Sequence, residues 1–104
     1  MSENTDIYKK VLSCFGYGRR NAMHMRQLAK LNQLSERELR KVIEIIRRSG
    51  ICVVSDNSGY YFPETREEIE SYIKRMERMA KSTFYTIKAA RNELERIDKN
   101  DFVN

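Results

Sequence analysis

The sequence predicts a mainly α fold with one small β-hairpin, followed by a long C-terminal helix. Three features support this prediction. Apolar residues recur at helical spacing along most of the chain, one β-branched segment precedes a polar turn and three aromatic residues, and residues 66–98 contain neither glycine nor proline. With 104 residues, the chain suits one compact domain and one protruding element. We expect residues 1–63 to form the domain and residues 64–104 to form the long helix and a short tail.

The first two helices are predicted from short apolar patterns. Asp6 should cap the first helix, which ends before Gly16 and leaves Arg19 and Arg20 in an exposed loop. The second should span about residues 24–31. Its expected inward residues are Met25, Leu28, Ala29 and Leu31.

The third helix has a well-defined N-terminal signal. Ser35, followed three residues later by Glu38, predicts a capping box in which each side chain accepts a hydrogen bond from the other residue's backbone N–H. An apolar stripe then repeats at helical spacing, and Gly50 favours termination just beyond it. The stripe comprises Leu39, Val42, Ile43 and Ile46.

Residues 51–65 predict a β-hairpin and the start of the last helix. The segment "ICVVS" is too short for a helix and rich in β-branched residues, "DNSG" is typical of a turn, and "YYF" suits a second strand. Pro63 should end that strand. Thr65 with Glu68 predicts a second capping box.

The long helix has an apolar repeat suited to helix pairing. The a positions of its heptads are Ile73, Ala80, Ile87 and Leu94, and the d positions are Ile69, Met76, Thr83, Ala90 and Ile97. Such a helix would be about 48 Å long, whereas a 100-residue globule has a radius of about 13 Å, so part of it needs a partner. In the first half, Tyr72, Met79 and Phe84 widen the apolar face, which favours packing on the N-terminal domain.

From residue 87 onward, a narrow apolar seam lies among charged residues, a pattern typical of paired helices. We therefore predict a homodimer formed through the C-terminal helix. The small residues of the seam allow close approach in either orientation, so parallel and antiparallel pairing both stay open. A monomer whose long helix is frayed or folded back is the alternative.

Positive charge is concentrated in the first part of the chain. Residues 1–63 hold 11 Lys and Arg against 6 Asp and Glu, whereas residues 64–104 hold 9 of each. This excess suits a polyanion, because neutralising phosphates releases counterions. A solvated basic surface that only aids solubility is the alternative interpretation.

The predicted elements follow one another in the order of a winged helix-turn-helix. The segment "RQLAKLNQLSERELRKVIEIIRRSGICVVSDNSGYYF" resembles the winged-helix family that includes biotin-repressor-type N-terminal domains and small phage-encoded DNA-binding proteins. The matching features are "QLAKL", Leu34 and Ser35 at the turn, "VIEIIRRSGI" and "SGYYF". The resemblance covers about residues 22–62, and the long helix departs from the biotin-repressor pattern, which argues against a ligase or biotin-related role.

If the third helix enters a major groove, its outward residues should contact DNA. Arg37 and Arg40 suit guanine, Lys41 suits a base or a phosphate, and Glu44 suits a base amine. Ser35 lies at the positive end of the helix, where a phosphate binds favourably.

Weaker contacts are expected around this helix. They comprise His24 and Arg26 at the start of the second helix, Arg19 and Arg20 in the preceding loop, and Asn57 and Ser58 at the hairpin tip. A surface or capping role is the alternative for His24. The tip contains Asp56 but neither Lys nor Arg, so we expect it to add little affinity.

The predicted function is sequence-specific binding of double-stranded DNA as a homodimer, in a transcriptional regulator or a phage-type replication or packaging accessory protein. The alternative is a protein-interaction or assembly module that uses the same scaffold without reading DNA.

Other classes are disfavoured. A single His, with no nucleophile motif and no Gly-rich phosphate loop, argues against an enzyme. Cys14 and Cys52 lack CxxC spacing and predict buried thiols, so neither a metal nor another cofactor is expected. No segment suits a signal peptide or a membrane span, which predicts a cytoplasmic protein without a membrane partner.

Overall fold

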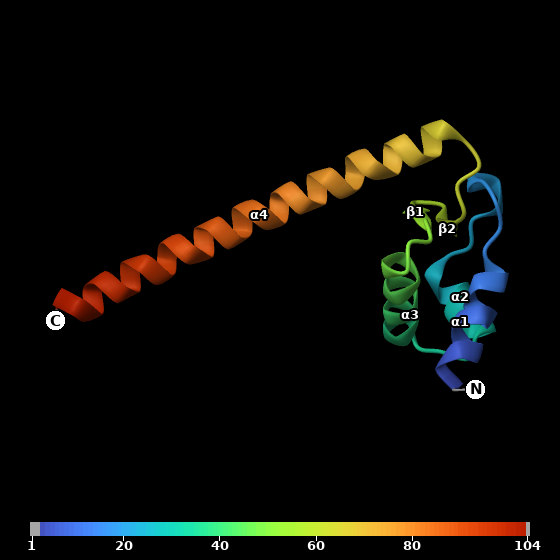
Figure 1. Ribbon diagram of the computed structural model, residues 1–104, viewed down its shortest axis with the longest axis horizontal. Helices are drawn as coiled ribbons and strands as arrows, with labels where there is room; N and C mark the ends of the chain where they lie inside the picture. The colour runs from blue at the N-terminus through green and yellow to red at the C-terminus, as the bar shows by residue number, and fades with distance from the viewer. Residues whose placement is uncertain (1–2, 104) are drawn as a thin grey trace. The chain divides into compact units, whose positions relative to one another are not determined.

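The structure, a computed structural model, describes the backbone of residues 3–103 and the side chains of residues 6–100. Its elements are α1 (Glu3–Cys14), the short 3-10 helix η1 (Arg19–Asn21), α2 (Met25–Leu31), α3 (Glu36–Arg48), β1 (Val54–Asp56), β2 (Gly59–Tyr61) and α4 (Arg66–Val103) (Figure 1). The predicted class, mainly α with one small hairpin and a long C-terminal helix, is confirmed. The last helix continues beyond residue 98, so the expected tail is helical up to Val103.

Contacts divide the chain into two compact units, one ending at Tyr72 and the other beginning at Ile73. We call them the N-terminal unit and the distal segment of α4. The boundary lies inside α4, so residues 66–72 belong with the shorter helices and the hairpin. Of the three residues expected to widen the apolar face of the first half of the helix, Tyr72 is half-buried, whereas Met79 and Phe84 are exposed.

The core of the N-terminal unit lies among the three shorter helices and the segment that leads into the hairpin. Its buried side chains are Val11, Phe15, Leu28, Ala29, Leu39, Val42, Ile43, Ile46 and Val53. The whole predicted stripe of α3 is among them, and both α1 and α2 pack against α3. This packing holds α3 by one face and leaves its other face outward.

Three local predictions are wrong. Helix α1 begins at Glu3, so Asp6 lies inside it rather than at its cap. Leu31 is 51% exposed, because α2 ends there and the next residue, Asn32, takes the buried position with its amide donating to Leu28 O (2.7 Å). Cys52 is exposed rather than buried, because only the two valines that follow it enter the core.

Helix α3 begins with the predicted capping box. Ser35 Oγ accepts a hydrogen bond from Glu38 N–H (3.1 Å), and Glu38 Oε1 accepts one from Ser35 N–H (3.0 Å). The box satisfies two backbone donors that have no carbonyl partner at the start of a helix. It thereby defines where α3 starts and which of its residues face outward.

The hairpin is tied to the loop between α1 and α2. Strands β1 and β2 pair antiparallel with Val54 opposite Tyr61, and Asn57 and Ser58 form the turn. Met23 pairs with Tyr60 through two backbone hydrogen bonds of 2.9 and 3.1 Å. Nearby, Phe62 N–H donates to Gly16 O (2.8 Å). The sequence analysis missed this third segment, which has no strand-like pattern of its own.

Arg47 joins the end of α3 to the hairpin. Its Nε and Nη2 donate to Val53 O at 3.0 and 2.8 Å, and Nη2 also donates to Ser55 Oγ at 3.2 Å. The guanidinium lies over the rings of Tyr60 and Tyr72, 5.8 and 5.4 Å from their centroids. These contacts occupy the side chain, so Arg47 serves the fold rather than an external ligand.

The second predicted capping box starts α4. Thr65 Oγ1 accepts from Glu68 N–H (3.2 Å), and Glu68 Oε1 accepts from Thr65 N–H (3.1 Å). The buried Glu68 carboxylate also accepts the N–H groups of Glu64 (2.8 Å) and Arg19 (2.9 Å). The bond from Glu64, followed by those from Arg19 and Thr65, holds the pKa of Glu68 below its ordinary value. One carboxylate therefore connects η1, the end of the hairpin and α4.

Candidate nucleic-acid interface

The outward face of α3 is the best candidate for a nucleic-acid contact. Arg37, Arg40, Lys41 and Glu44 are all exposed, and their spacing of three and four residues places them on the side opposite the buried stripe. Arg48 extends this side by one more turn, with 76% of its side chain exposed. The sequence analysis missed Arg48, although its spacing of four residues from Glu44 could have indicated it.

Two of the three carboxylates near this face are occupied by protein contacts, whereas Glu36, exposed in the first turn of α3, forms no ion pair with a described side chain. Glu38 belongs to the capping box, where the backbone N–H of Ser35 lowers the pKa of its carboxyl. Glu44 forms an ion pair with Arg48 (2.7 Å). Arg37 and Arg40 form no ion pair with any residue whose side chain the structure describes. The face thus presents unpaired cations at the N-terminal half of α3.

Three further predicted residues lie at helix N-termini. Ser35 Oγ accepts the cap bond, which leaves its hydroxyl proton for donation. His24 occupies the N-cap position of α2, is exposed and makes no side-chain cap hydrogen bond. Arg26 is exposed in the first turn of the same helix. All three are accessible to an anion.

The two arginines of η1 are already paired. Arg19 Nε lies 3.0 Å from Asp56 Oδ2, and Arg20 binds both carboxylate oxygens of Glu64 at 2.6 and 3.0 Å. These hydrogen bonds raise the pKa of both guanidinium groups above the ordinary value for arginine. Each charge is offset before a ligand arrives, so we rank Arg19 and Arg20 below Arg37 and Arg40 as DNA contacts.

Asp56 organises the hairpin tip. Its carboxylate accepts hydrogen bonds from Tyr61 Oη (2.6 Å) and Ser58 N–H (2.7 Å), in addition to the pair with Arg19. Partial burial raises the pKa of this carboxyl, but the three bonds outweigh burial and the pKa lies below its ordinary value. Asn57 is exposed and Ser58 is half-buried. The tip can therefore offer hydrogen bonds but no positive charge.

The apolar seam of α4 is exposed along the distal segment. Ile73, Ile87, Leu94 and Ile97 are 47%, 45%, 60% and 43% exposed. Ala80, Thr83 and Ala90 are exposed as well, and Met76 is half-buried. Thr83 Oγ1 donates to Met79 O (2.9 Å), so its hydroxyl is satisfied within the helix. Such a seam suits burial against another helix better than exposure to water.

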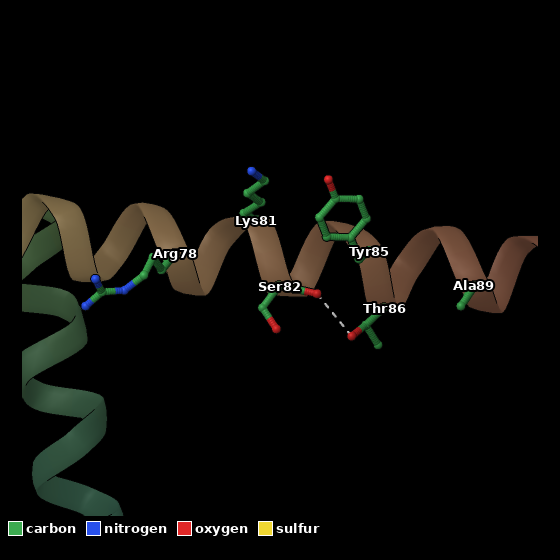
Figure 2. A pocket seen from close by; sticks show the side chains of 6 residues that line it. All are labelled: Arg78, Lys81, Ser82, Tyr85, Thr86 and Ala89. Carbon is green, nitrogen blue, oxygen red and sulfur yellow. Dashed lines mark hydrogen bonds between the residues drawn. The ribbon is translucent and has the colours of Figure 1, made fainter.

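The balanced charge of residues 64–104 conceals a basic block. Residues 73–92 hold six Lys and Arg against one Glu, whereas acidic residues outnumber basic ones on either side of this block. The sequence analysis missed the block because it summed charge over the whole C-terminal part. Two of its cations, Arg78 and Lys81, line a shallow hollow on α4 together with Tyr85 (Figure 2).

Comparison with protein-family models, curated proteins and solved structures finds no significant match to this chain. The winged-helix assignment therefore stays a prediction based on motifs and element order. Within the described residues, no group of three or more His, Cys, Asp and Glu is placed to hold a metal ion. In the same part of the chain, no helix combines the length and the apolar character needed to cross a membrane.

Proposed function

We propose that the protein is a winged helix-turn-helix protein that binds double-stranded DNA sequence-specifically as a homodimer, with α3 as its recognition helix. The observation that supports this best is the outward face of α3, with its unpaired arginines on a rigidly anchored helix. A recognition helix needs this combination. Its side chains reach the bases only if the domain fixes the orientation of the helix, so that the same face always points into the groove.

The arrangement suggests a role for each group of residues. Arg37 and Arg40 lie in the first half of α3 and are suited to guanine edges, whereas Lys41 is suited to a phosphate. Arg48 is a weaker phosphate contact, because Glu44 already pairs with it. Glu44, held by Arg48, would orient that cation or accept from a base amine. The remaining contacts are backbone contacts from Ser35, His24 and Arg26, with smaller contributions from Arg19, Arg20, Asn57 and Ser58.

Selection of bound sequences from a random DNA pool tests this function. An inverted repeat with a defined half-site spacing is the expected result, because a two-fold dimer presents two copies of α3. Absence of duplex binding at about 50 mM salt would contradict the proposal, since phosphate contacts are strongest at low salt.

Single substitutions test the interface itself. Arg40→Ala should weaken binding to the selected site by about 1–3 kcal/mol and relax preference at one base pair. Arg66→Ala, an exposed cation outside the proposed interface, is the control and should leave affinity nearly unchanged. Replacing Asn57 and Ser58 by Ala should cost less affinity than Arg40→Ala, and the reverse order would show that the hairpin tip is the main contact.

These properties suit a cytoplasmic transcriptional regulator or a phage-type replication or packaging accessory protein. The exposed seam of α4 also supports a second candidate, a protein-assembly module that does not read DNA. In that case Arg37→Ala and Arg40→Ala leave function intact, whereas Leu94→Asp abolishes it. The two candidates therefore predict opposite effects for the two arginine variants.

A further inference from the structure

A straight row of basic side chains lies on the distal segment of α4. The row contains Lys74, Arg78, Lys81 and Lys88, at spacings of four, three and seven residues. Tyr85 divides the last interval into four and three, so the spacing alternates between four and three along the whole row. This spacing keeps the five residues on one side of the helix. We call them the outer stripe. In Figure 2 the side chains of Lys81 and Tyr85 extend to the same side of α4.

The outer stripe lies opposite the apolar seam. In the heptads of α4 the seam takes the a and d positions, whereas the stripe takes only b and f, the positions that face away from a paired helix. A second copy bound to the seam therefore leaves the stripe in contact with solvent. One helix can pair and bind an anionic ligand at the same time.

The cations of the stripe are not neutralised within the chain. Toward the two ends of α4, Arg66 pairs with Glu70, Arg96 with Glu93 and Lys99 with Glu95. Within the described part of the helix, Lys74, Arg78, Lys81 and Lys88 form no ion pair, and all four are exposed. Glu70 and Glu77 lie four residues before Lys74 and Lys81, the spacing of a favourable pair, but Glu70 binds Arg66 instead and neither lysine forms an ion pair with a described side chain. Four cations therefore outweigh the one neighbouring acid of the row, Glu77.

We propose that the outer stripe is a second DNA-binding surface, which binds the phosphate backbone of double-stranded DNA without regard to sequence. From Lys74 to Lys88 the stripe extends about 21 Å along the helix, and duplex DNA places one negative charge about every 1.7 Å along its axis. A row of four cations along one side of a helix can therefore contact several phosphates of a duplex at once, whatever the base sequence. Tyr85 Oη adds a hydrogen-bond donor in the middle of the line.

This inference shares its ligand with the proposed function but rests on α4 alone. The outward face of α3 would discriminate between sequences, whereas the outer stripe would raise affinity for all sequences equally. An anionic membrane surface is the other macromolecular ligand that a row of lysines suits. Duplex DNA is favoured because bulky apolar residues that insert into lipid are few beside the stripe. The hollow on one side includes Ser82, Thr86 and Ala89 in its lining, and on the other side the exposed Phe84 lies between the charged residues Glu77 and Arg91.

The test uses the full chain with Lys74, Arg78, Lys81 and Lys88 replaced by Gln. The control replaces Lys9, Lys10, Arg66 and Lys99 by Gln, which removes the same net charge from exposed positions outside the stripe. Binding to a random-sequence duplex is followed by fluorescence anisotropy across a salt series. Circular dichroism and sedimentation establish that each variant keeps its helix content and oligomeric state.

At about 50 mM salt, the stripe variant should bind the random duplex at least about tenfold more weakly than the wild type. The slope of log affinity against log salt concentration should fall by up to about 0.9 for each phosphate that is no longer neutralised. The control should keep most of its affinity and slope. Equal losses in both variants, or wild-type binding by the stripe variant, would overturn the inference. Binding of the wild type to phosphatidylserine vesicles that only the stripe variant loses, with duplex binding unchanged, would overturn it in favour of a membrane surface.

A variant with Arg37→Ala and Arg40→Ala separates this inference from the proposed function. If it loses sequence preference but keeps stripe-dependent binding to random duplex, both are supported. If the wild type shows no sequence preference but binds random duplex through the stripe, the proposed function fails and the outer stripe stands.

Discussion

Gly59 is a residue at which the hairpin accepts no side chain. Its φ is +120°, and a Cβ atom there would lie 2.5 Å from Met23 O. The Met23 backbone cannot easily move away, because two hydrogen bonds hold it to Tyr60. Gly59→Ala should therefore lower the free energy of unfolding by about 2–4 kcal/mol, measured by urea denaturation.

Gly50 provides a matched control for that substitution. Its φ is +100°, but a Cβ atom there would meet nothing within 4 Å. Gly50→Ala should cost only the backbone term, about 1–2 kcal/mol. Equal losses for the two variants would show that the approach to Met23 is unimportant.

Glu68 should make stability depend on pH. The pKa of Glu68 is lowered in the folded state, so its ionised form stabilises the fold. This contribution is complete above the ordinary glutamate pKa of about 4.3 and is lost as the pH falls through the lower folded-state pKa. Glu68→Gln should have a lower thermal midpoint than the wild type at neutral pH, and the difference should shrink toward about pH 3. Thermal unfolding followed by circular dichroism measures this. Glu67→Gln, at the exposed neighbouring position, should show no such convergence.

Helix α3 shows how much of an element the sequence can predict. Its cap, its buried stripe and its exposed cations are correct because each depends on residues three or four positions apart. The hairpin was predicted less fully. Its strands follow from local composition, but the pairing of Met23 with Tyr60 joins segments far apart in the chain. The same limit explains why Arg19 and Arg20 look available in the sequence although they are paired in the structure.

The e positions of α4 favour an antiparallel pair. When Ile73 faces Ile97 of the second copy, Ala80 faces Ala90. The e residues Glu77 and Arg91 of opposite copies then lie next to each other twice, both times along the same edge of the seam. A parallel pair would instead place Glu93 next to Asp98. We therefore expect the antiparallel arrangement, which attaches the two N-terminal units at opposite ends of the pair.

Charge reversal tests this orientation. Glu77→Arg alone and Arg91→Glu alone should each raise the dimer dissociation constant roughly tenfold, because two attractive contacts become repulsive. The double variant should recover most of the wild-type value in sedimentation equilibrium. Additive losses would exclude this antiparallel register, since a parallel pair does not bring the two residues together.

The proposed homodimer can be tested on the whole molecule with Leu94→Asp. This seam position is 60% exposed in the single chain, so a carboxylate there leaves the chain folded but places a charge inside the pair. The variant should sediment as a monomer and bind an inverted repeat more weakly, with an unchanged thermal midpoint for the N-terminal unit. Asn92→Asp adds the same charge outside the seam and should remain dimeric. If the wild type itself is a monomer, the pairing argument is wrong.

The sequence by itself determined the class of fold, both capping boxes, the buried face of α3 and the heptad seam of α4. All of these depend on residues within about one or two helical turns of each other, so their spacing along the chain is enough. Only the tertiary structure decided which charges are available. Asp56, Glu64 and Glu68 meet Arg19 and Arg20 after the chain has folded back over more than thirty positions, and no periodic pattern records such a meeting. Arg37 and Arg40 on α3 and the outer stripe on α4 therefore keep their charge available, whereas the loop that looked basic in the sequence is largely neutralised.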